Sequence, residues 1–578
     1  MVGRLTAKGT TRLRPGRRGP AVFHEGCELS PGDTSHTDRD HCNRFRGPRV
    51  PRRPAAAPGV AHVTSGNTHG PQRTRGEPVG DDSERGGDGR VRLGSRTGRW
   101  VIGATVLGSG AAFLDGSVVN VALPAIGRGL GGGLTVLQWV LDGYLLTLSA
   151  LLLFGGALGD RYGHRRVFAA GLALFTAASL GCGLAPTPAL LIAARLAQGV
   201  GGALLVPGSL AIIDATISRD DRGAAVGRWA APSGAASALG PFIGGWLVDA
   251  ASWRWVFLIN LPLAALTMLA LRRVPESRAG GAARLDYAGA AAVTAGLGGA
   301  VYALIEVPAH GWSPAAAVLA AVGVAGLVAF PLIERRQADP LLPLRMLRSR
   351  QFVGVNAVTL AVYSALGGAL FLLTLQLQNT LGYSALRAGL ATLPMTVIMM
   401  ALSSRIGALA QRTGARLPMT AGPVLAGGGV ALMALARPGG SYLTSVLPGV
   451  VVFGFGMALT VAPLTSTVLA SVDEAHVGAA SGTNNAVSRL ANLLAVAVLP
   501  PLAGLSARGD GPLGPGFSRA MLIAAAVCAA GGPVAWFAVR RSVPVRGHTP
   551  AGIHQACQDP RTRRGHGTRA GKNVPRPT

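Results

Sequence analysis

Charged residues are scarce in this sequence of 578 residues, because Asp, Glu, Lys and Arg together make up only 14% of it. An ordinary soluble chain carries about a quarter of its residues as charges, so the composition excludes that class. Lysine is nearly absent and occurs only as Lys8 and Lys572. Neither lies in a Gly-x4-Gly-Lys-Ser/Thr motif, which excludes a phosphate-binding loop and therefore ATP as an energy source held within this chain.

Cysteine is rare, and common catalytic motifs are missing. The five cysteines form no Cys-x-x-Cys pair, so neither a zinc site nor a disulfide framework is predicted. No His-Glu-x-x-His or Gly-x-Ser-x-Gly motif lies in an apolar segment, and we expect neither an enzyme nor a cofactor or metal. The net charge of +28 is nearly all arginine and has no aromatic-rich basic domain with it, which argues against nucleic acid as a partner.

Long apolar runs, by contrast, fill the sequence between Trp100 and Val539. A helix of about 20 residues crosses the roughly 30 Å hydrocarbon core of a bilayer, so each run predicts a membrane span. The sequence therefore predicts an all-α polytopic membrane protein. We place its fourteen spans at residues 100–124, 136–158, 167–185, 189–213, 224–248, 255–271, 286–306, 314–333, 352–376, 387–404, 418–436, 443–468, 479–503 and 519–539.

Arginine is concentrated in alternate short loops, after the second, fourth, sixth, eighth and tenth predicted spans. Because basic loops stay on the cytoplasmic side, this pattern predicts that both termini are cytoplasmic. The flanking segments 1–97 and 542–578 are polar and basic and cannot bury a core, so we expect disordered tails. No methionine occurs between Met1 and Met268, which leaves open that the first tail is a misassigned start.

The loop after the second predicted span is repeated later in the chain. Residues 156–165 (GALGDRYGHR) match residues 407–416 (GALAQRTGAR) at six of ten positions. Two copies in the same order and on the same side of the membrane indicate a parallel duplication. We therefore predict a first six-helix half, two extra helices with a basic linker, and a second six-helix half, at residues 98–272, 273–350 and 351–541.

Five short motifs follow one another in the first half. They are Asp115…Asn120-Val-Ala-Leu-Pro124, Gly156…Asp160-Arg161-Tyr162-Gly163-His164-Arg165-Arg166, Leu191…Arg195…Gln198-Gly199, Gly234…Gly240-Pro241…Gly244-Gly245 and Trp253-Arg254-Trp255…Asn260…Pro262. Together they resemble the major facilitator superfamily, and within it the fourteen-span branch of drug:proton antiporters. The resemblance covers about residues 100–540, with Gly159 in place of the usual alanine.

The resemblance implies a major facilitator fold and a multi-pass protein of the bacterial plasma membrane. It also implies proton-coupled efflux of drugs or antibiotics by alternating access. The expected partners are a small lipophilic or cationic substrate, protons and the bilayer. Two rival functions stay open: a carrier of the same fold that exports one metabolite or amino acid, and a membrane receptor that transports nothing.

Asp115 and Arg195 are charged residues inside predicted spans. A charge at mid-membrane costs about 2.5–3.5 kcal/mol on insertion scales, so each should face a partner or a watery cavity. We predict that they couple transport to protons. A helix-packing hydrogen bond for Asp115, and a structural ion pair for Arg195, are the alternatives.

Other residues receive roles from their place in a span or from the resemblance. Asp142 either lines the substrate cavity or is a satisfied structural acid, and three amides are further cavity candidates: Asn120, Gln376 and Gln378. The resemblance implies a cytoplasmic gating loop, made by Gly156, Asp160, Arg161, Gly163, Arg165 and Arg166. It also implies an antiporter-type helix in which small residues allow bending or close packing, namely Gly234, Gly240, Pro241, Gly244 and Gly245.

Overall fold

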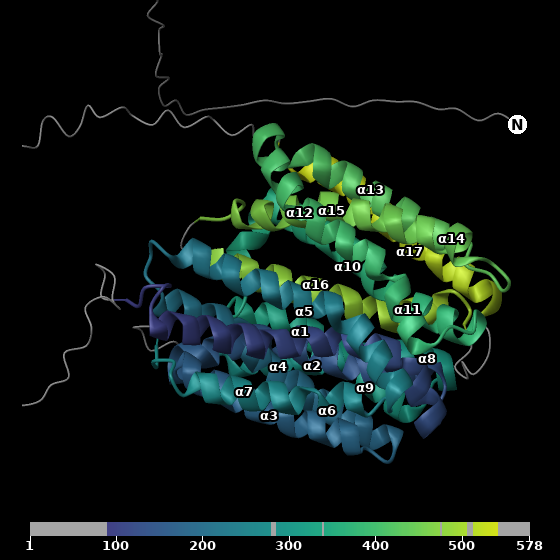
Figure 1. Cartoon of the computed structure of the whole chain (residues 1–578), viewed down its shortest axis with the longest axis horizontal. Coiled ribbons are helices and arrows are strands. Elements are labelled where there is room, and N and C mark those ends of the chain that lie inside the picture. The colour runs from purple at the N-terminus through teal and green to yellow at the C-terminus, as the bar shows by residue number, and fades with distance from the viewer. Residues whose placement is uncertain (1–89, 279–284, 338–339, 474–476, 506–512, 541–578) are drawn as a thin grey trace, which may run out of the picture. The chain divides into compact units, whose positions relative to one another are not determined.

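The structure is a computed structural model that describes residues 90–278, 285–337, 340–473, 477–505 and 513–540 (Figure 1). Most of the two predicted tails lies outside these ranges. Residues 90–97, which we had assigned to the first tail, join the helices instead: Val91 exchanges backbone hydrogen bonds with Thr216 and Ser218. Leu93 anchors the segment because its side chain is buried and its backbone nitrogen donates to Asp221 Oδ2.

The described residues are helical and contain no strand beyond a single β-bridge between Val91 and Ile217. The helices of the first half pack mainly as α2 with α4, α3 with α4, and α1 with α5 and α7. Their bounds are α1 (Arg96–Leu130), α2 (Leu134–Tyr162), α3 (His164–Leu184), α4 (Pro188–Thr216), α5 (Arg222–Ala250), α6 (Trp255–Leu258) and α7 (Asn260–Leu271).

Two helices stand between the halves in sequence, α8 (Tyr287–His310) and α9 (Pro314–Glu334). They pack on each other, and α8 also contacts α2 of the first half and α16 of the second. The second half follows as η2 (Leu344–Arg348), α10 (Arg350–Leu375), the π-helical turn η3 (Gln376–Thr380), α11 (Ala385–Ala391), α12 (Leu393–Thr413), α13 (Arg416–Met433), α14 (Tyr442–Ser445), α15 (Leu447–Leu469), α16 (Val477–Leu502) and α17 (Gly514–Ala538).

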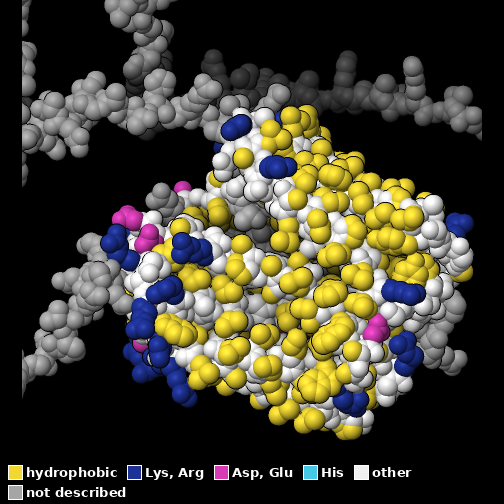
Figure 2. All heavy atoms as spheres, viewed as in Figure 1, with side chains coloured by type: hydrophobic (Ala, Val, Ile, Leu, Met, Phe, Trp, Pro, Cys, Tyr) yellow, Lys and Arg dark blue, Asp and Glu magenta, His cyan; other side chains and the backbone are white. Residues whose placement is uncertain are grey.

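Eleven helical segments of the described chain are long and apolar enough to cross a membrane. The other three predicted spans also coincide with helices, namely α5, the α6–α7 pair and α13. The face shown in Figure 2 is mostly hydrophobic, and its charged side chains gather toward its ends. Large apolar side chains such as Val318, Val324 and Phe537 are exposed. Such a surface suits contact with lipid, with polar groups left for the interfaces.

The internal repeat reappears in the backbone. Gly163 ends α2 with φ = 104°, and Gly414, its counterpart in the repeat, ends α12 with φ = 89°. Glycine adopts positive φ without steric cost, so the same residue type makes the same turn in both copies. The two loops therefore share a local backbone structure as well as sequence identity.

The two halves meet closely where α5 ends. A Cβ on Gly245 would lie against the backbone of Ala385 and Leu386, and α5 contacts α11 there. Gln378 Nε2 also donates to the carbonyl of Val121 on α1 at 2.8 Å, which is a hydrogen bond between the halves. At the start of α5 the packing is looser: three of its glycines face open space, namely Gly223, Gly227 and Gly234.

Candidate functional site

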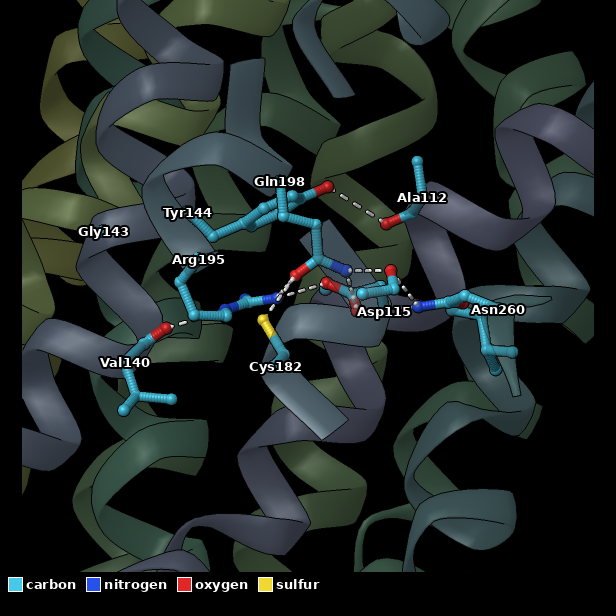
Figure 3. A network of polar contacts seen from close by, with 12 residues as sticks. Ala112, Asp115, Val140, Gly143, Tyr144, Cys182, Arg195, Gln198 and Asn260 are labelled. Atoms are coloured by element: carbon cyan, nitrogen blue, oxygen red, sulfur yellow. Dashed lines mark hydrogen bonds and ion pairs between the residues drawn. The ribbon is translucent and has the colours of Figure 1, made fainter. Parts of the chain in front are cut away.

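Asp115 on α1 and Arg195 on α4 form a buried ion pair (Figure 3). Arg195 Nη1 lies 2.6 Å from Asp115 Oδ2, and both side chains are fully inaccessible to solvent. Arg195 also donates from Nε to the carbonyl of Val140 on α2 at 2.9 Å, and from Nη1 to Gln198 Oε1 at 2.6 Å. The guanidinium is therefore held between α1, α2 and its own helix.

The other carboxylate oxygen of Asp115 is held by two amides. Gln198 Nε2 donates to Asp115 Oδ1 at 2.8 Å, and Asn260 Nδ2 donates to the same atom at 3.1 Å. Both amide nitrogens also reach Ser179 Oγ on α3, at 2.8 and 3.3 Å. The ionised carboxylate is thus bonded to α4 and to the first residue of α7, and the network ties four helices together.

Aromatic rings enclose the guanidinium. The central carbon of the Arg195 guanidinium lies 4.4 Å from the centroid of the Tyr144 ring and 5.7 Å from that of Phe257. Tyr144 OH in turn donates to the carbonyl of Ala112 at 3.3 Å. A guanidinium in this setting is stabilised by the faces of the rings. We call Asp115, Ser179, Arg195, Gln198 and Asn260 the α1–α4 polar network.

The four predicted cavity residues lie apart from this network and make separate contacts. Asp142 is fully buried on α2, and neither carboxylate oxygen has a hydrogen-bond partner in the described part of the chain. Gln376 is buried in the second half and donates to the carbonyl of Ala436 at 2.7 Å. Gln378 bonds to α1, and Asn120 donates to the Gly116 carbonyl of its own helix, at 3.4 Å.

The predicted gating loop forms the junction of α2 and α3, but an acid that we had not singled out completes it. Glu276, just after α7, accepts from the backbone nitrogen of Arg165 at 3.1 Å and pairs with Arg166 Nε at 3.6 Å. Asp160 instead faces His164 at 3.6 Å, and Arg161 lies over the ring of its neighbour Tyr162. The sequence could have pointed to Glu276, because it is a lone acid among the arginines that follow the sixth predicted span.

The predicted antiporter-type residues lie on α5, which is one continuous helix through Pro241. A Cβ on Gly240 would meet the side chain of Ser117 on α1, and one on Gly244 would meet the side chain and carbonyl of Val118. Gly156, in the gating loop, has only the Pro207 side chain nearby. Close packing of α1 on α5 thus requires glycine at two of the predicted positions.

Replacing Gly244 with valine is expected to lower the free energy of unfolding by about 1–3 kcal/mol, because overpacking forces α1 and α5 apart. Gly234 provides the matched control: it lies on the same helix, and a Cβ there meets nothing within 4 Å. Thermal unfolding of both valine variants in detergent measures the difference. Equal losses would show that helix propensity, and not the α1–α5 contact, sets the effect.

Apolar helices that repeat a loop structure, with a buried ion pair between two of them, are typical of secondary transporters, and this is the class of protein that the fold indicates. The comparison with known families identifies it further. Residues 105–496 match the model of the Major Facilitator Superfamily, and the chain belongs to that superfamily. With its many apolar helices, it is a multi-pass protein of the cell membrane.

Curated relatives carry names of antibiotic transporters. The chain is 37% identical over 417 residues to the probable actinorhodin transporter of Streptomyces coelicolor, a match that covers 70% of this chain and 72% of that protein. It is 37% identical over 437 residues to the cephamycin export protein CmcT of Amycolatopsis lactamdurans, with 73% and 90% covered. A crystal structure of a POT family transporter in complex with 5-aminolevulinic acid shares the fold, with a TM-score of 0.59, 15% identity, and 77% and 97% covered.

Proposed function

We propose that this chain exports antibiotics or other drugs in exchange for protons, by alternating access, through fourteen spans with both termini in the cytoplasm. The observation that carries the proposal is the α1–α4 polar network, closed from solvent, in a chain that is 37% identical to an antibiotic export protein. Asp115 is the proton carrier in this proposal, and Arg195 is its counter-charge.

Proton binding acts on α1 through the network. The ionised Asp115 accepts bonds from Arg195, Gln198 and Asn260, so a proton removes the charge that holds these three donors. The same helix contacts α5, α10 and α11, and the carbonyl of Val121 on α1 binds the second half. Loosening α1 from α4 therefore changes the contact between the halves, which alternating access requires.

The structure corresponds to the cytoplasm-facing state in this proposal. The halves meet where α5 ends and are looser where it begins. The arginine-rich loops lie at the looser end, because α2 ends there with Arg161 and α5 begins with Arg222. If basic loops are cytoplasmic, the opening faces the cytoplasm, where an exporter loads its substrate.

Energised inverted vesicles that contain the chain test the proposal. Respiration acidifies the lumen, and exchange of an added drug for lumenal protons raises the lumenal pH. A pH rise on addition of a compound from a panel of antibiotics and dyes, absent from vesicles without the chain, is the expected result. A rise with one metabolite alone would favour the single-substrate carrier. Drug accumulation that survives an uncoupler would contradict proton antiport.

Asp249 connects the halves at the closed end, and its removal should open that end. Its carboxylate accepts from the backbone nitrogens of Ala385 at 3.1 Å and Leu386 at 2.9 Å. Each bond contributes roughly 1 kcal/mol when partly exposed to solvent. Asp249→Ala is therefore expected to shift the chain toward the outward-open state. Pulsed electron paramagnetic resonance between spin labels at Ala251 and Pro438 should show a longer distance.

Ser384 offers the control at the same helix start. Its Oγ accepts from the backbone nitrogen of Arg387 at 3.3 Å, within the second half alone. Ser384→Ala removes a cap of α11 without removing a bond to α5, so the label distance should stay as in the unmodified chain. An equal lengthening in both variants would assign the effect to fraying of α11.

A further inference from the structure

Arg489 lies midway along α16 and has no acidic partner within ion-pair distance among the residues that the structure describes. Its side chain is partly exposed, unlike that of Arg195. Nε donates to Asn485 Oδ1 on the same helix at 3.2 Å, and neither terminal nitrogen is hydrogen-bonded within the part of the chain that the structure describes. An ionisable residue at this depth is expensive, and it commonly marks a substrate or ion path.

Two tyrosines, Tyr144 on α2 and Tyr363 on α10, lie near enough to Arg489 to interact with it electrostatically. A phenol is a hydrogen-bonding group and not the anionic partner that a guanidinium requires. Asp142 also lies inside a span but forms no hydrogen bond or ion pair with Arg489. One positive charge between the halves therefore lacks a counter-charge in this state.

Aromatic side chains from the first half face the same region. The guanidinium carbon of Arg489 lies 5.9 Å from the centroid of the Phe113 ring on α1. Phe113 contacts Trp229 on α5 at a centroid distance of 6.5 Å, and Trp229 Nε1 donates to Ser109 Oγ at 3.1 Å. Phe113, Trp229 and Tyr363 are all partly exposed. A cation and apolar rings thus converge from helices of both halves.

We propose that Arg489 binds an acidic group of the exported compound, so that the substrates are organic anions with an aromatic or apolar body. A carboxylate fits the two terminal nitrogens of a guanidinium as a bidentate pair. Phe113 and Trp229 then offer ring surface to the rest of the molecule. This inference rests on the proposed export function, and it replaces the lipophilic or cationic substrate expected from the resemblance.

The exchange of such an anion for a proton is electrogenic. One anion moves outward and one proton moves inward in each cycle, so two positive charges enter for every molecule exported. The membrane potential acts on each of these charges. An uncharged substrate exchanged for the same proton would carry one charge. Potential dependence therefore distinguishes an anionic cargo from a neutral one.

The test uses inverted vesicles and matched radiolabelled pairs: the aromatic acid nalidixic acid and its primary amide, benzoic acid and benzamide, with ethidium as a cation. The wild type should accumulate the acids at least tenfold better than the amides. A lumen-positive potential set with potassium and valinomycin should raise acid uptake more than amide uptake. Arg489→Gln should abolish both preferences, and Arg489→Lys should keep part of them.

Further variants and substrates distinguish a failure of this inference from a failure of the proposed function. Arg519→Gln removes an exposed arginine of the same half and should change nothing. Proton-coupled uptake of ethidium without uptake of any acid would overturn the inference and leave the proposed function standing. Uptake of no compound by a folded wild type would overturn both.

Discussion

Replacing Asp115 with asparagine is expected to reduce the substrate-triggered pH rise in inverted vesicles to the level of vesicles without the chain. Asparagine keeps a carbonyl oxygen for Gln198 and Asn260 but cannot take up a proton. The variant should still fold, because Arg195 keeps its bonds to the Val140 carbonyl and to Gln198. The variant should therefore lose the coupling of transport to protons and keep its substrate-binding site.

Two measurements distinguish a loss of proton coupling from a loss of folded protein. Exchange of labelled for unlabelled substrate without a proton gradient should persist in Asp115→Asn, because that exchange needs no proton movement. Asp220→Asn is the matched control, since Asp220 is an exposed acid in the loop before α5. A normal pH response in Asp115→Asn, with the protein monodisperse on gel filtration, would remove Asp115 from the coupling step.

The helices were largely predictable because hydropathy reports burial in lipid directly. The predicted span 286–306 lies within one residue of α8 at its start, and every predicted span meets a helix. Helix ends were less predictable: α1 runs over Arg96–Leu130, well beyond 100–124. Helices continue into the interfaces, where their residues are polar and hydropathy no longer marks them.

Breaks in the helix within a span were also not predictable from the sequence. The predicted span 387–404 is divided at Thr392 into α11 and α12, two residues before Pro394. A proline inside an apolar run is compatible with a break or with a continuous helix. α5, which continues through Pro241, shows the second outcome. The choice depends on neighbouring helices, which sequence periodicity does not report.

The two charged residues of the site were predictable, but their bonds to each other and to the amides were not. A charge inside a span needs a partner or a watery cavity, and this physical argument singled out Asp115 and Arg195 without pairing them. The amides of Gln198 and Asn260 were visible in the motifs, but their bonds depend on the register of α4 and α7 against α1. Arg489, like Asp142, is a charge inside a predicted span, but we did not single it out. Neither residue has an ion-pair partner among the described residues.

Replacing Arg195 with glutamine should destabilise the chain more strongly than any surface substitution. It leaves the carboxylate of Asp115 buried without its counter-charge, and breaking a buried pair in this way costs about 3–5 kcal/mol. The double replacement Asp115→Asn, Arg195→Gln removes both charges and leaves neutral amides that can bond to each other. Its free energy of unfolding should therefore fall by much less than the sum of the two single losses.

A double-mutant cycle on the apparent unfolding temperature in detergent measures this coupling. Arg254→Gln serves as the control, because Arg254 is partly buried, donates to the carbonyl of Ala185 and has no acidic partner among the described residues. The fall in unfolding temperature caused by Arg254→Gln should simply add to the fall caused by Asp115→Asn. If the effect of Arg195→Gln also adds to that of Asp115→Asn, the charge of Arg195 does not stabilise the charge of Asp115. A proton arriving at Asp115 would then not release α4, and the coupling step would need another route.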